Sequence, residues 1–399
     1  MDLIWRKQDM IIKKLAALGA AIAMMASLTA CSMPAVLYVP DAGGASAASS
    51  VTVDEAAAEA AKKETIADDQ EAFPGMIETD TVRSGLEAAP KKVTDHTLRV
   101  GFCPSAVDVY YNRIWYGIQD TLKDTGYDIE FDYQAPSSQT ATDEAVTIVE
   151  GWIAQGYDAI CLTIADEASL LPVIREATEA GIPIFLFNSP QFENDFYVSN
   201  IGYDQAYGGY LLGQYVGKYY EGQEDVGLCF VIGVAGDSFT RQRMSGFNEA
   251  IAEFENIEIL DTQEGNWSRA DAAAVAEDMI QAYPDMDGFV TLFDDMGLGI
   301  YQTVKAAGLN NQINIFGYDN MSSIYDLIAN NTNYINTVDT CTYVTGRNMV
   351  YAVEKYCVEG EMIPKTIFME PVTYDASNLA EFDYLQYGEG PKGSGASEG

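Results

Sequence analysis

From residue 98 onward, short apolar runs alternate with longer stretches whose apolar residues recur at helical spacing. Glycines close three of the early helical stretches, at Gly126, Gly156 and Gly181, and glycine is the residue that most often ends a helix. This pattern predicts strands at 98–102, 128–133, 159–163 and 182–187, with helices at 112–125, 142–154 and 168–180.

The same alternation starts again near residue 196. It predicts further strands at 196–201, 226–232, 257–262, 288–292 and 313–317, and helices at 204–220, 240–254, 268–282, 296–307 and 322–330. Strands that alternate with helices form a parallel sheet covered on both faces. The sequence therefore predicts an α/β fold built from two doubly wound parallel-sheet lobes.

The first 30 residues have the pattern of an export signal. Basic residues between 6 and 14 precede an uncharged apolar run over 15–27. That run is too short to span a bilayer, which needs about 20 apolar residues. It ends in LTAC at 28–31, which resembles the lipobox of bacterial lipoproteins and implies cleavage before Cys31 and lipid on that residue. The alternatives are an ordinary signal peptide with an unrelated cysteine, or a short buried helix.

Two segments have the composition of linkers. Residues 31–96 begin with Cys31 and are rich in Ala, Ser and acidic residues without a sustained core pattern, which predicts an acidic tether. Residues 383–399 are rich in glycine and predict a flexible tail.

Composition narrows the class of protein further. The 399 residues include 22 basic and 60 acidic ones, for a net charge of −38, and a field of that sign repels nucleic acid. Without residues 1–30, 18 basic and 58 acidic residues remain and the net charge is −40. His96 is the only histidine, which disfavours histidine-based catalysis and multi-histidine metal sites. We therefore expect no cofactor and no metal site.

Five cysteines remain once Cys31 is assigned to lipid, and three of them lie inside apolar runs. An odd, unclustered set does not predict a disulfide framework. A bond between Cys341 and Cys357 is the pairing that the sequence leaves open.

Polar and aromatic side chains gather where the predicted strands end, the edge at which doubly wound sheets bind ligands. Sugar hydroxyls both donate and accept hydrogen bonds, so carboxylates, amides and arginine can hold them. The C–H faces of a sugar pack on aromatic rings. The segments that offer this combination are 105–111, 188–190, 236–241, 293–295 and 318–320, with Trp267 in a further loop.

Four motifs carry a family resemblance: IPIFLFN at 182–188, GDSFTR at 236–241 followed by GF at 246–247, DDMGLG at 294–299, and FGYD at 316–319. With these motifs, residues 97–382 resemble the type I periplasmic sugar-binding proteins of ABC transporters, the ribose and glucose/galactose-binding family. The stretch at 374–382 is similar to the glucose/galactose branch.

The resemblance implies roles for residues of the first lobe. Asp108 and Asn188 would bind sugar hydroxyls, and Tyr110 or Tyr111 would stack on one sugar face. Ser189 departs from the family, which has a basic residue at that position. Considered locally, the two tyrosines also fit a place in the core.

The resemblance implies a second set of ligand-binding residues from the other lobe: Asp237, Arg241, Trp267, Asp294, Asp319 and Thr340. Trp267 would close the second sugar face, and the others would bind hydroxyls. Phe293 and Thr340 stand where the family has amides, and these departures leave the sugar unidentified. Considered locally, Arg241 also fits a surface ion pair and Asp319 a helix cap.

The resemblance further implies two lobes joined by three crossings, near Tyr203, near Thr340 and near residues 365–368. The first lobe would comprise 97–203 and 341–366, and the second 204–340 and 367–382. Such a protein is a monomer and not an enzyme. It is held by lipid at the extracytoplasmic face of the membrane and delivers a monosaccharide to an ABC permease.

Three other classes remain as alternatives. A lipoprotein of the same fold could present a sugar or an autoinducer-type ligand to a membrane receptor kinase. A transcription regulator with the same core would need a helix-turn-helix at its start, where this chain has an export signal. An enzyme is disfavoured because no nucleophile–base pair, phosphate loop or metal cluster stands out.

Overall fold

The computed structural model describes residues 69–77, 93, 95–190, 196–330 and 332–379. The predicted signal peptide, the lipidation site at Cys31 and the tail at 383–399 lie outside the described residues.

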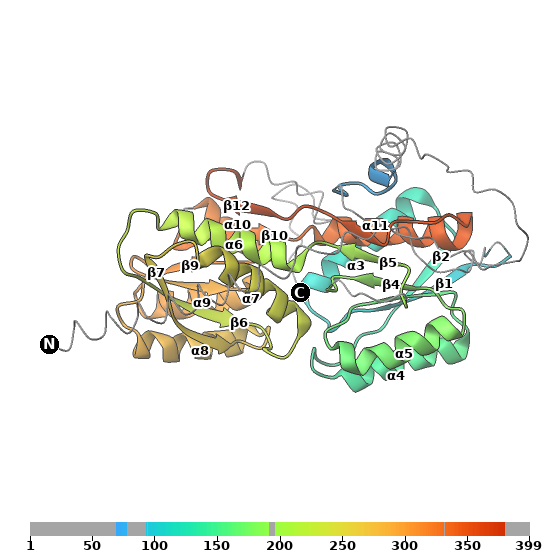
Figure 1. Ribbon diagram of the computed structural model, residues 1–399, viewed down its shortest axis with the longest axis horizontal. Helices are drawn as coiled ribbons and strands as arrows, with labels where there is room; N and C mark the ends of the chain where they lie inside the picture. Colours follow the sequence, from blue (N-terminus) through green and yellow to red (C-terminus); the bar gives the residue numbers. More distant parts are fainter. Residues whose placement is uncertain (1–68, 78–92, 94, 191–195, 331, 380–399) are drawn as a thin grey trace, which may run out of the picture. The chain divides into compact units, whose positions relative to one another are not determined.

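The first lobe is a parallel six-stranded sheet of order β11-β5-β4-β3-β1-β2. Helices α4 and α5 cover one face, and α3 and α11 cover the other (Figure 1). The strands are β1 Leu98–Cys103, β2 Ile129–Tyr133, β3 Ala159–Leu162, β4 Ile184–Phe187, β5 Ser199–Gly202 and β11 Thr366–Phe368. The helices are α3 Val109–Thr125, α4 Thr142–Gln155, α5 Glu167–Glu179 and α11 Thr342–Val353, which continues into the π-helical segment Glu354–Glu359.

The second lobe is a six-stranded sheet of order β12-β10-β9-β8-β6-β7, in which β12 runs antiparallel to β10 at the edge. The two parallel-dominated sheets confirm the predicted fold class. The second sheet differs from the prediction of purely parallel sheets only in its antiparallel edge strand β12. The strands are β6 Val226–Ile232, β7 Ile257–Glu264, β8 Gly288–Thr291, β9 Asn314–Phe316, β10 Tyr334–Asp339 and β12 Val372–Asp375. The helices are α6 Gln205–Tyr219, α7 Ser238–Ile251, α8 Arg269–Ala282, α9 Asp294–Ala306 and α10 Ser322–Ala329.

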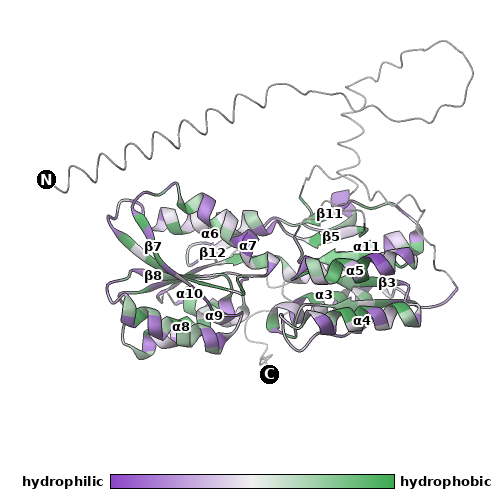
Figure 2. Ribbon diagram, turned by 60° about the horizontal axis from the view of Figure 1, so that its bottom comes forward, coloured by the Kyte–Doolittle hydropathy of each residue, from purple (hydrophilic) through white to green (hydrophobic). Residues whose placement is uncertain are grey.

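Each sheet buries both of its faces because alternate strand residues point to opposite sides. In β6, Leu228 and Phe230 pack in the cluster that includes residues of α6 and α7, whereas Cys229 and Val231 pack in the cluster with residues of α8 and α9. The helices show the matching pattern of apolar and polar stripes (Figure 2). Strands that are apolar on both faces explain the short, unbroken apolar runs in the sequence.

Three crossings join the lobes, and the third differs from its predicted place. Tyr203 follows β5 and precedes α6, and Thr340 follows β10. β11 pairs with β5 in the first sheet, so the third crossing follows Phe368 and comprises residues 369–371. Ile367 and Phe368 thus belong to the first lobe, not the second.

Part of the predicted tether packs against the first lobe. Phe73 and Met76 are buried in the core cluster. The Ile77 amide donates to the Phe368 carbonyl (2.9 Å), and Met76 forms an antiparallel bridge with Met369. The prediction of a tether is therefore wrong for residues 69–77. Two isolated apolar residues have no periodicity, so their docking left no recognisable pattern in the sequence.

Helices α6 and α7 approach each other closely because glycines face the contact. A Cβ atom at Gly246 of α7 would overlap the carbonyl oxygen of Ala206, and one at Gly209 of α6 would overlap that of Arg243. The backbones of the two helices thus lie in contact. This packing fixes the position of α7, which contributes to the site described below.

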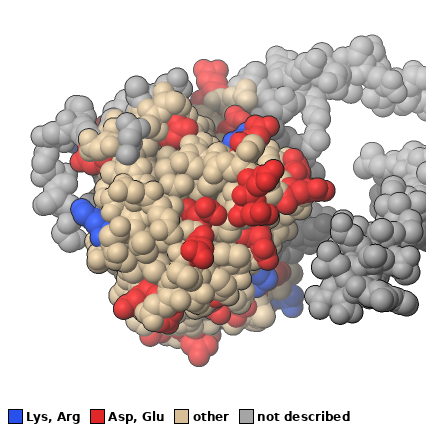
Figure 3. All heavy atoms as spheres, turned by 90° about the vertical axis from the view of Figure 1, so that its left-hand side faces the viewer, with Lys and Arg blue, Asp and Glu red and all other residues tan. Residues whose placement is uncertain are grey.

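On the molecular face seen in Figure 3, acidic side chains clearly outnumber basic ones. Cys103, Cys161, Cys229, Cys341 and Cys357 are free buried thiols, so the Cys341–Cys357 bond left open by the sequence does not form. Within the described ranges, no helix is both long and apolar enough to cross a membrane.

Candidate ligand-binding site

A pocket lies between the two lobes and is lined by residues of both. Most of its lining residues follow the carboxyl ends of strands, where ligands bind in doubly wound sheets. The lining comprises Asp108, Tyr110, Tyr111, Gln139, Asn188, Phe239, Arg243, Trp267, Phe293 and Asp319.

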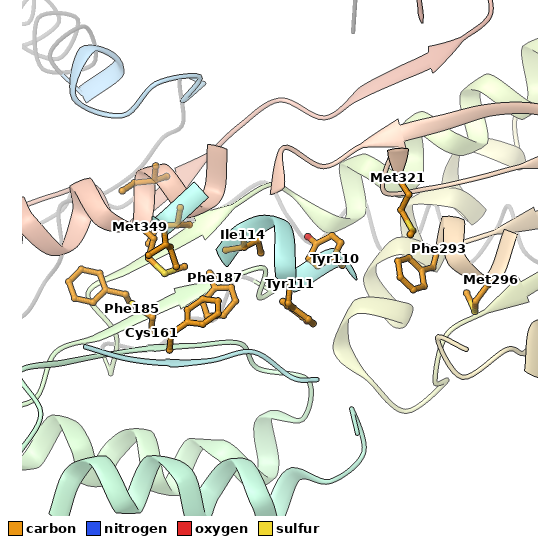
Figure 4. Packing of buried hydrophobic residues seen from close by; sticks show 14 of the residues in the cluster. Tyr110, Tyr111, Ile114, Cys161, Phe185, Phe187, Phe293, Met296, Met321 and Met349 are labelled. Carbon is orange, nitrogen blue, oxygen red and sulfur yellow. The ribbon is translucent and has the colours of Figure 1, made fainter. Parts of the chain in front are cut away.

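The start of α3 forms the first-lobe wall. Asp108 caps the helix, and its Oδ1 accepts a hydrogen bond from the Tyr111 amide (2.9 Å). The Tyr110 hydroxyl donates to Asn188 Oδ1 (2.8 Å), and the Tyr111 hydroxyl is bonded to Ser105 Oγ (2.7 Å). The two tyrosine rings stand nearly perpendicular, at 82°. Figure 4 shows both tyrosines at the end of the first-lobe core nearer to Phe293.

A buried ion pair forms the polar part of the second-lobe wall. Arg243 and Asp319 are 3% and 2% exposed, and Arg243 Nη1 lies 3.2 Å from Asp319 Oδ2. The same Nη1 donates to the Leu292 carbonyl (2.7 Å). The guanidinium also lies over the rings of Tyr318 (4.4 Å) and Trp267 (5.5 Å), and such contacts stabilise a desolvated cation.

Gln205, directly after the first crossing, connects the two walls. Its Nε2 donates to Asn188 Oδ1 (2.7 Å). Its Oε1 accepts from Arg243 Nε (2.8 Å) and from the Tyr203 hydroxyl (2.7 Å). The buried amide of Gln205 is thus hydrogen-bonded to one pocket residue of each lobe, Asn188 and Arg243.

Aromatic rings form the rest of the second-lobe wall, from Phe239, Trp267 and Phe293. The Trp267 and Phe293 rings lie 6.2 Å apart at 72°. Trp267 Nε1 donates to Asp237 Oδ2 (2.6 Å), so the only polar group of this indole is engaged. The wall therefore presents apolar surface to the pocket.

Three pocket residues have left-handed backbones that non-glycine residues rarely adopt. They are Asn188 (φ 42°), Trp267 (φ 56°) and Asp319 (φ 88°). Backbone strain of this kind gathers at ligand sites, where the surrounding structure imposes it. The three residues support the assignment of this pocket as the functional site.

Burial shifts the pKa values of the pocket carboxyls. It raises the pKa of Asp108 to about 7, and the charges of Asp319 and Asp295 add to that rise. Burial also raises the pKa of Asp319, while its ion pair with Arg243 opposes the shift. The pocket thus holds a carboxyl, that of Asp108, whose pKa lies near neutral pH and which has no cationic partner at hydrogen-bond distance among the residues that the structure describes.

Six predicted site residues line the pocket: Asp108, Tyr110, Tyr111, Asn188, Trp267 and Asp319. Four do not: Asp237, Arg241, Asp294 and Thr340. Two of these four act through pocket residues. Asp237 caps α7 and holds Trp267, and the Thr340 hydroxyl donates to Asp319 Oδ1 (3.3 Å).

The arginine that lines the pocket is Arg243, not the predicted Arg241. Arg241 is exposed, donates to the Gly236 carbonyl and lines a separate hollow with Ser245 and Phe368. The buried side of α7 includes Phe239, Arg243, Gly246, Phe247 and Ala250. Helical periodicity counted along α7 would have assigned Arg243 to the core-facing stripe and Arg241 to the surface.

Asp294 is a structural carboxylate. It is fully buried and accepts from the amides of Tyr318 (2.9 Å) and Met321 (3.0 Å) and from the hydroxyls of Tyr334 (2.6 Å) and Thr337 (2.7 Å). These bonds tie the segment after β9 to β10. The segment includes Asp319, so Asp294 supports the pocket without reaching it.

Four lining residues were given no ligand-binding role by the sequence predictions: Gln139, Phe239, Arg243 and Phe293. Phe239 lies within the motif GDSFTR, and Phe293 directly precedes the motif DDMGLG. Both positions could therefore have been assigned to the site from the sequence. Gln139 lies in a loop between β2 and α4, and no sequence pattern distinguishes it.

Hydrogen bonds join the lobes directly. The Ser238 amide donates to the Ala165 carbonyl (3.1 Å), and its hydroxyl donates to the Ile164 carbonyl (2.9 Å). Arg113 Nη1 of α3 donates to the Asn320 carbonyl (3.1 Å). The two lobes are thus in direct contact.

Two α/β lobes with a pocket between them fit a ligand-binding protein, and comparison gives the family. A family model described as periplasmic binding protein domain matches residues 100–361. The chain belongs to the periplasmic binding protein family, which confirms the predicted resemblance to its type I sugar-binding members. The prediction that the chain is not an enzyme is confirmed too, because its relatives are binding proteins.

Two relatives show how far the similarity extends. The chain is 32% identical over 195 residues to the D-ribose/D-allose-binding protein of Pseudomonas aeruginosa, covering 48% of this chain and 60% of that protein. It is 26% identical over 273 residues to the fructose import binding protein FruE of Bifidobacterium longum, covering 66% of this chain and 80% of that protein. The chain thus spans about three fifths of the Pseudomonas relative's length.

Solved structures share the fold. The glucose-galactose binding protein GanP from Geobacillus stearothermophilus matches with a TM-score of 0.64 and 22% identity, covering 71% of this chain and 99% of that one. An ABC transporter periplasmic solute binding protein from Actinobacillus succinogenes, with bound D-allose, matches with a TM-score of 0.63 and 23% identity. It covers 71% of this chain and all of the matched one.

Proposed function

We propose that this protein captures a monosaccharide in the pocket between its lobes and delivers it to an ABC permease. One observation carries the proposal: the pocket combines hydrogen-bonding groups of both lobes with aromatic rings. Carboxylates, an amide and arginine suit hydroxyls, and aromatic rings suit the C–H faces of a sugar. Relatives named as sugar import binding proteins support the same proposal.

Thermal unfolding with a ligand panel tests this function. The purified protein without residues 1–31 is heated with monosaccharides, disaccharides, amino acids and nucleosides. A bound sugar at 100 times its Kd should stabilise the protein by about 2.7 kcal/mol. Stabilisation by an amino acid or a nucleoside, with none by any sugar, would contradict the proposal.

The proposal extends to the membrane. Lipid on Cys31 would hold the protein at the extracytoplasmic face beside its permease, as the LTAC motif at 28–31 suggests. Cys31→Ala should then move the protein from the membrane fraction into the soluble fraction of producing cells. Unchanged membrane association of this variant would exclude the lipid anchor.

Sugar affinity should rise with pH between 5 and 8. Burial raises the pKa of Asp108 to about 7 in the ligand-free protein. Sugar hydroxyls that donate to the carboxylate favour its ionised form and lower this pKa in the complex. Binding therefore releases a proton below pH 7, and the affinity should fall as acid protonates Asp108, by up to about tenfold for each unit of pKa difference.

Calorimetry of wild type and Asp108→Asn across this pH range measures the effect. The variant should bind more weakly and lose most of the pH dependence. If affinity depended on pH equally in wild type and in the variant, a group other than Asp108 would be responsible for the pH dependence.

A further inference from the structure

The position of Phe293 limits which sugar can fill the pocket. Phe293 is 4% exposed and lines the pocket beside Trp267. Their rings are inclined at 72°, so both cannot lie flat against one face of a sugar ring. If Trp267 stacks on the face, Phe293 meets the edge, where the substituents project.

The polar groups of Leu292, Asp294 and Trp267, which surround Phe293, already have hydrogen-bond partners within the protein. The neighbouring Leu292 carbonyl accepts from Arg243 (2.7 Å), and the Asp294 carboxylate accepts four hydrogen bonds from protein groups. Trp267 Nε1 is bonded to Asp237. A sugar hydroxyl placed here would leave water without a replacement hydrogen bond, and an unpaired buried polar group is costly.

Other residues of the lining have the reverse character. Asp108 and Asn188 of the first lobe and Arg243 and Asp319 of the second supply carboxylates, an amide and a guanidinium. A ligand that fits both the polar and the apolar parts of the lining carries hydroxyls on one part and hydrogen or a methyl group on another.

We propose that the pocket selects a deoxy monosaccharide, with Phe293 facing the carbon that lacks its hydroxyl group. This inference rests on the proposed sugar-binding function and adds a substrate class to it. Phe293 determines specificity because a phenyl ring accommodates C–H or CH₃ and offers no hydrogen bond to O–H.

Matched sugar pairs test the inference by calorimetry on the protein without residues 1–31. The pairs are galactose with 6-deoxygalactose, mannose with 6-deoxymannose, ribose with 2-deoxyribose, and glucose with its 2-, 3- and 6-deoxy forms. In wild type, the deoxy sugar of at least one pair should bind about tenfold or more tightly than its parent. Phe293→Asn should reduce or reverse that preference, whereas Phe293→Leu, which keeps an apolar side chain, should retain it.

Thermal unfolding of each variant establishes that it is folded. Parent sugars that bind as well as or better than every deoxy partner would overturn the inference and leave the proposed function intact. An unchanged deoxy preference in Phe293→Asn would overturn the role of Phe293. Absence of binding by every sugar of the panel to folded wild type would overturn the proposed function, and the inference with it.

Discussion

Replacing Arg243 with alanine should abolish sugar binding and lower the free energy of unfolding by about 3–5 kcal/mol. The loss is large because the variant leaves the Asp319 carboxylate, 2% exposed, without its cationic partner, and breaking a buried ion pair from one side costs about that much. Chemical denaturation measures the stability, and calorimetry with the sugar found in the panel measures the binding.

Arg241→Ala is the matched control, two residues away on the same helix. Arg241 is exposed and lies outside the pocket, so its loss should change stability by no more than about 0.5 kcal/mol and leave affinity nearly unchanged. If Arg241→Ala abolished binding and Arg243→Ala retained it, the pocket described here would not be the sugar site.

Gly246→Ala should destabilise the protein by about 3 kcal/mol. The added methyl group would overlap the Ala206 carbonyl oxygen, and backbone atoms cannot turn aside as a flexible side chain can. Helices α6 and α7 would have to separate, with the strain typical of an overpacked core. Urea denaturation monitored by circular dichroism gives the change in free energy.

Gly151→Ala provides the contrasting control in helix α4. A Cβ atom there would meet no backbone atom within 4 Å, and only the end of the Gln155 side chain at 4.0 Å. Alanine should stabilise this helix by up to about 1 kcal/mol through its higher helix propensity. A similar loss of stability in both variants would show that close helix packing is not the cause at Gly246.

The fold was largely predictable from the sequence because many strands, such as β3 and β4, are short apolar runs that alternate with stretches of helical spacing. The third crossing was harder to place. β11 has only three residues, Thr366–Phe368, and so short a strand shows no pattern that assigns it to one sheet or the other. Its membership is fixed by its pairing with β5, a contact between residues far apart in the chain.

The site was predicted less completely, for a physical reason that differs among residues. Asp294 has the residue type of a ligand contact, but its carboxylate satisfies four protein donors. Hydrogen-bond partners that come from other strands cannot be recognised in a linear motif. The exchange of Arg241 for Arg243 is different, because helical periodicity along α7 contains that information.

The hydrogen bonds of Gln205 fix the orientation of two side-chain amides at the pocket, its own and that of Asn188. Arginine can only donate, so the amide oxygen of Gln205 must face Arg243, and its NH₂ group must face Asn188. Asn188 must then present its own oxygen to Gln205, and its NH₂ group is turned the other way. Neither amide can turn over to suit a different ligand. Epimers that differ in one hydroxyl direction should therefore be told apart by an orientation that the protein sets before any sugar arrives.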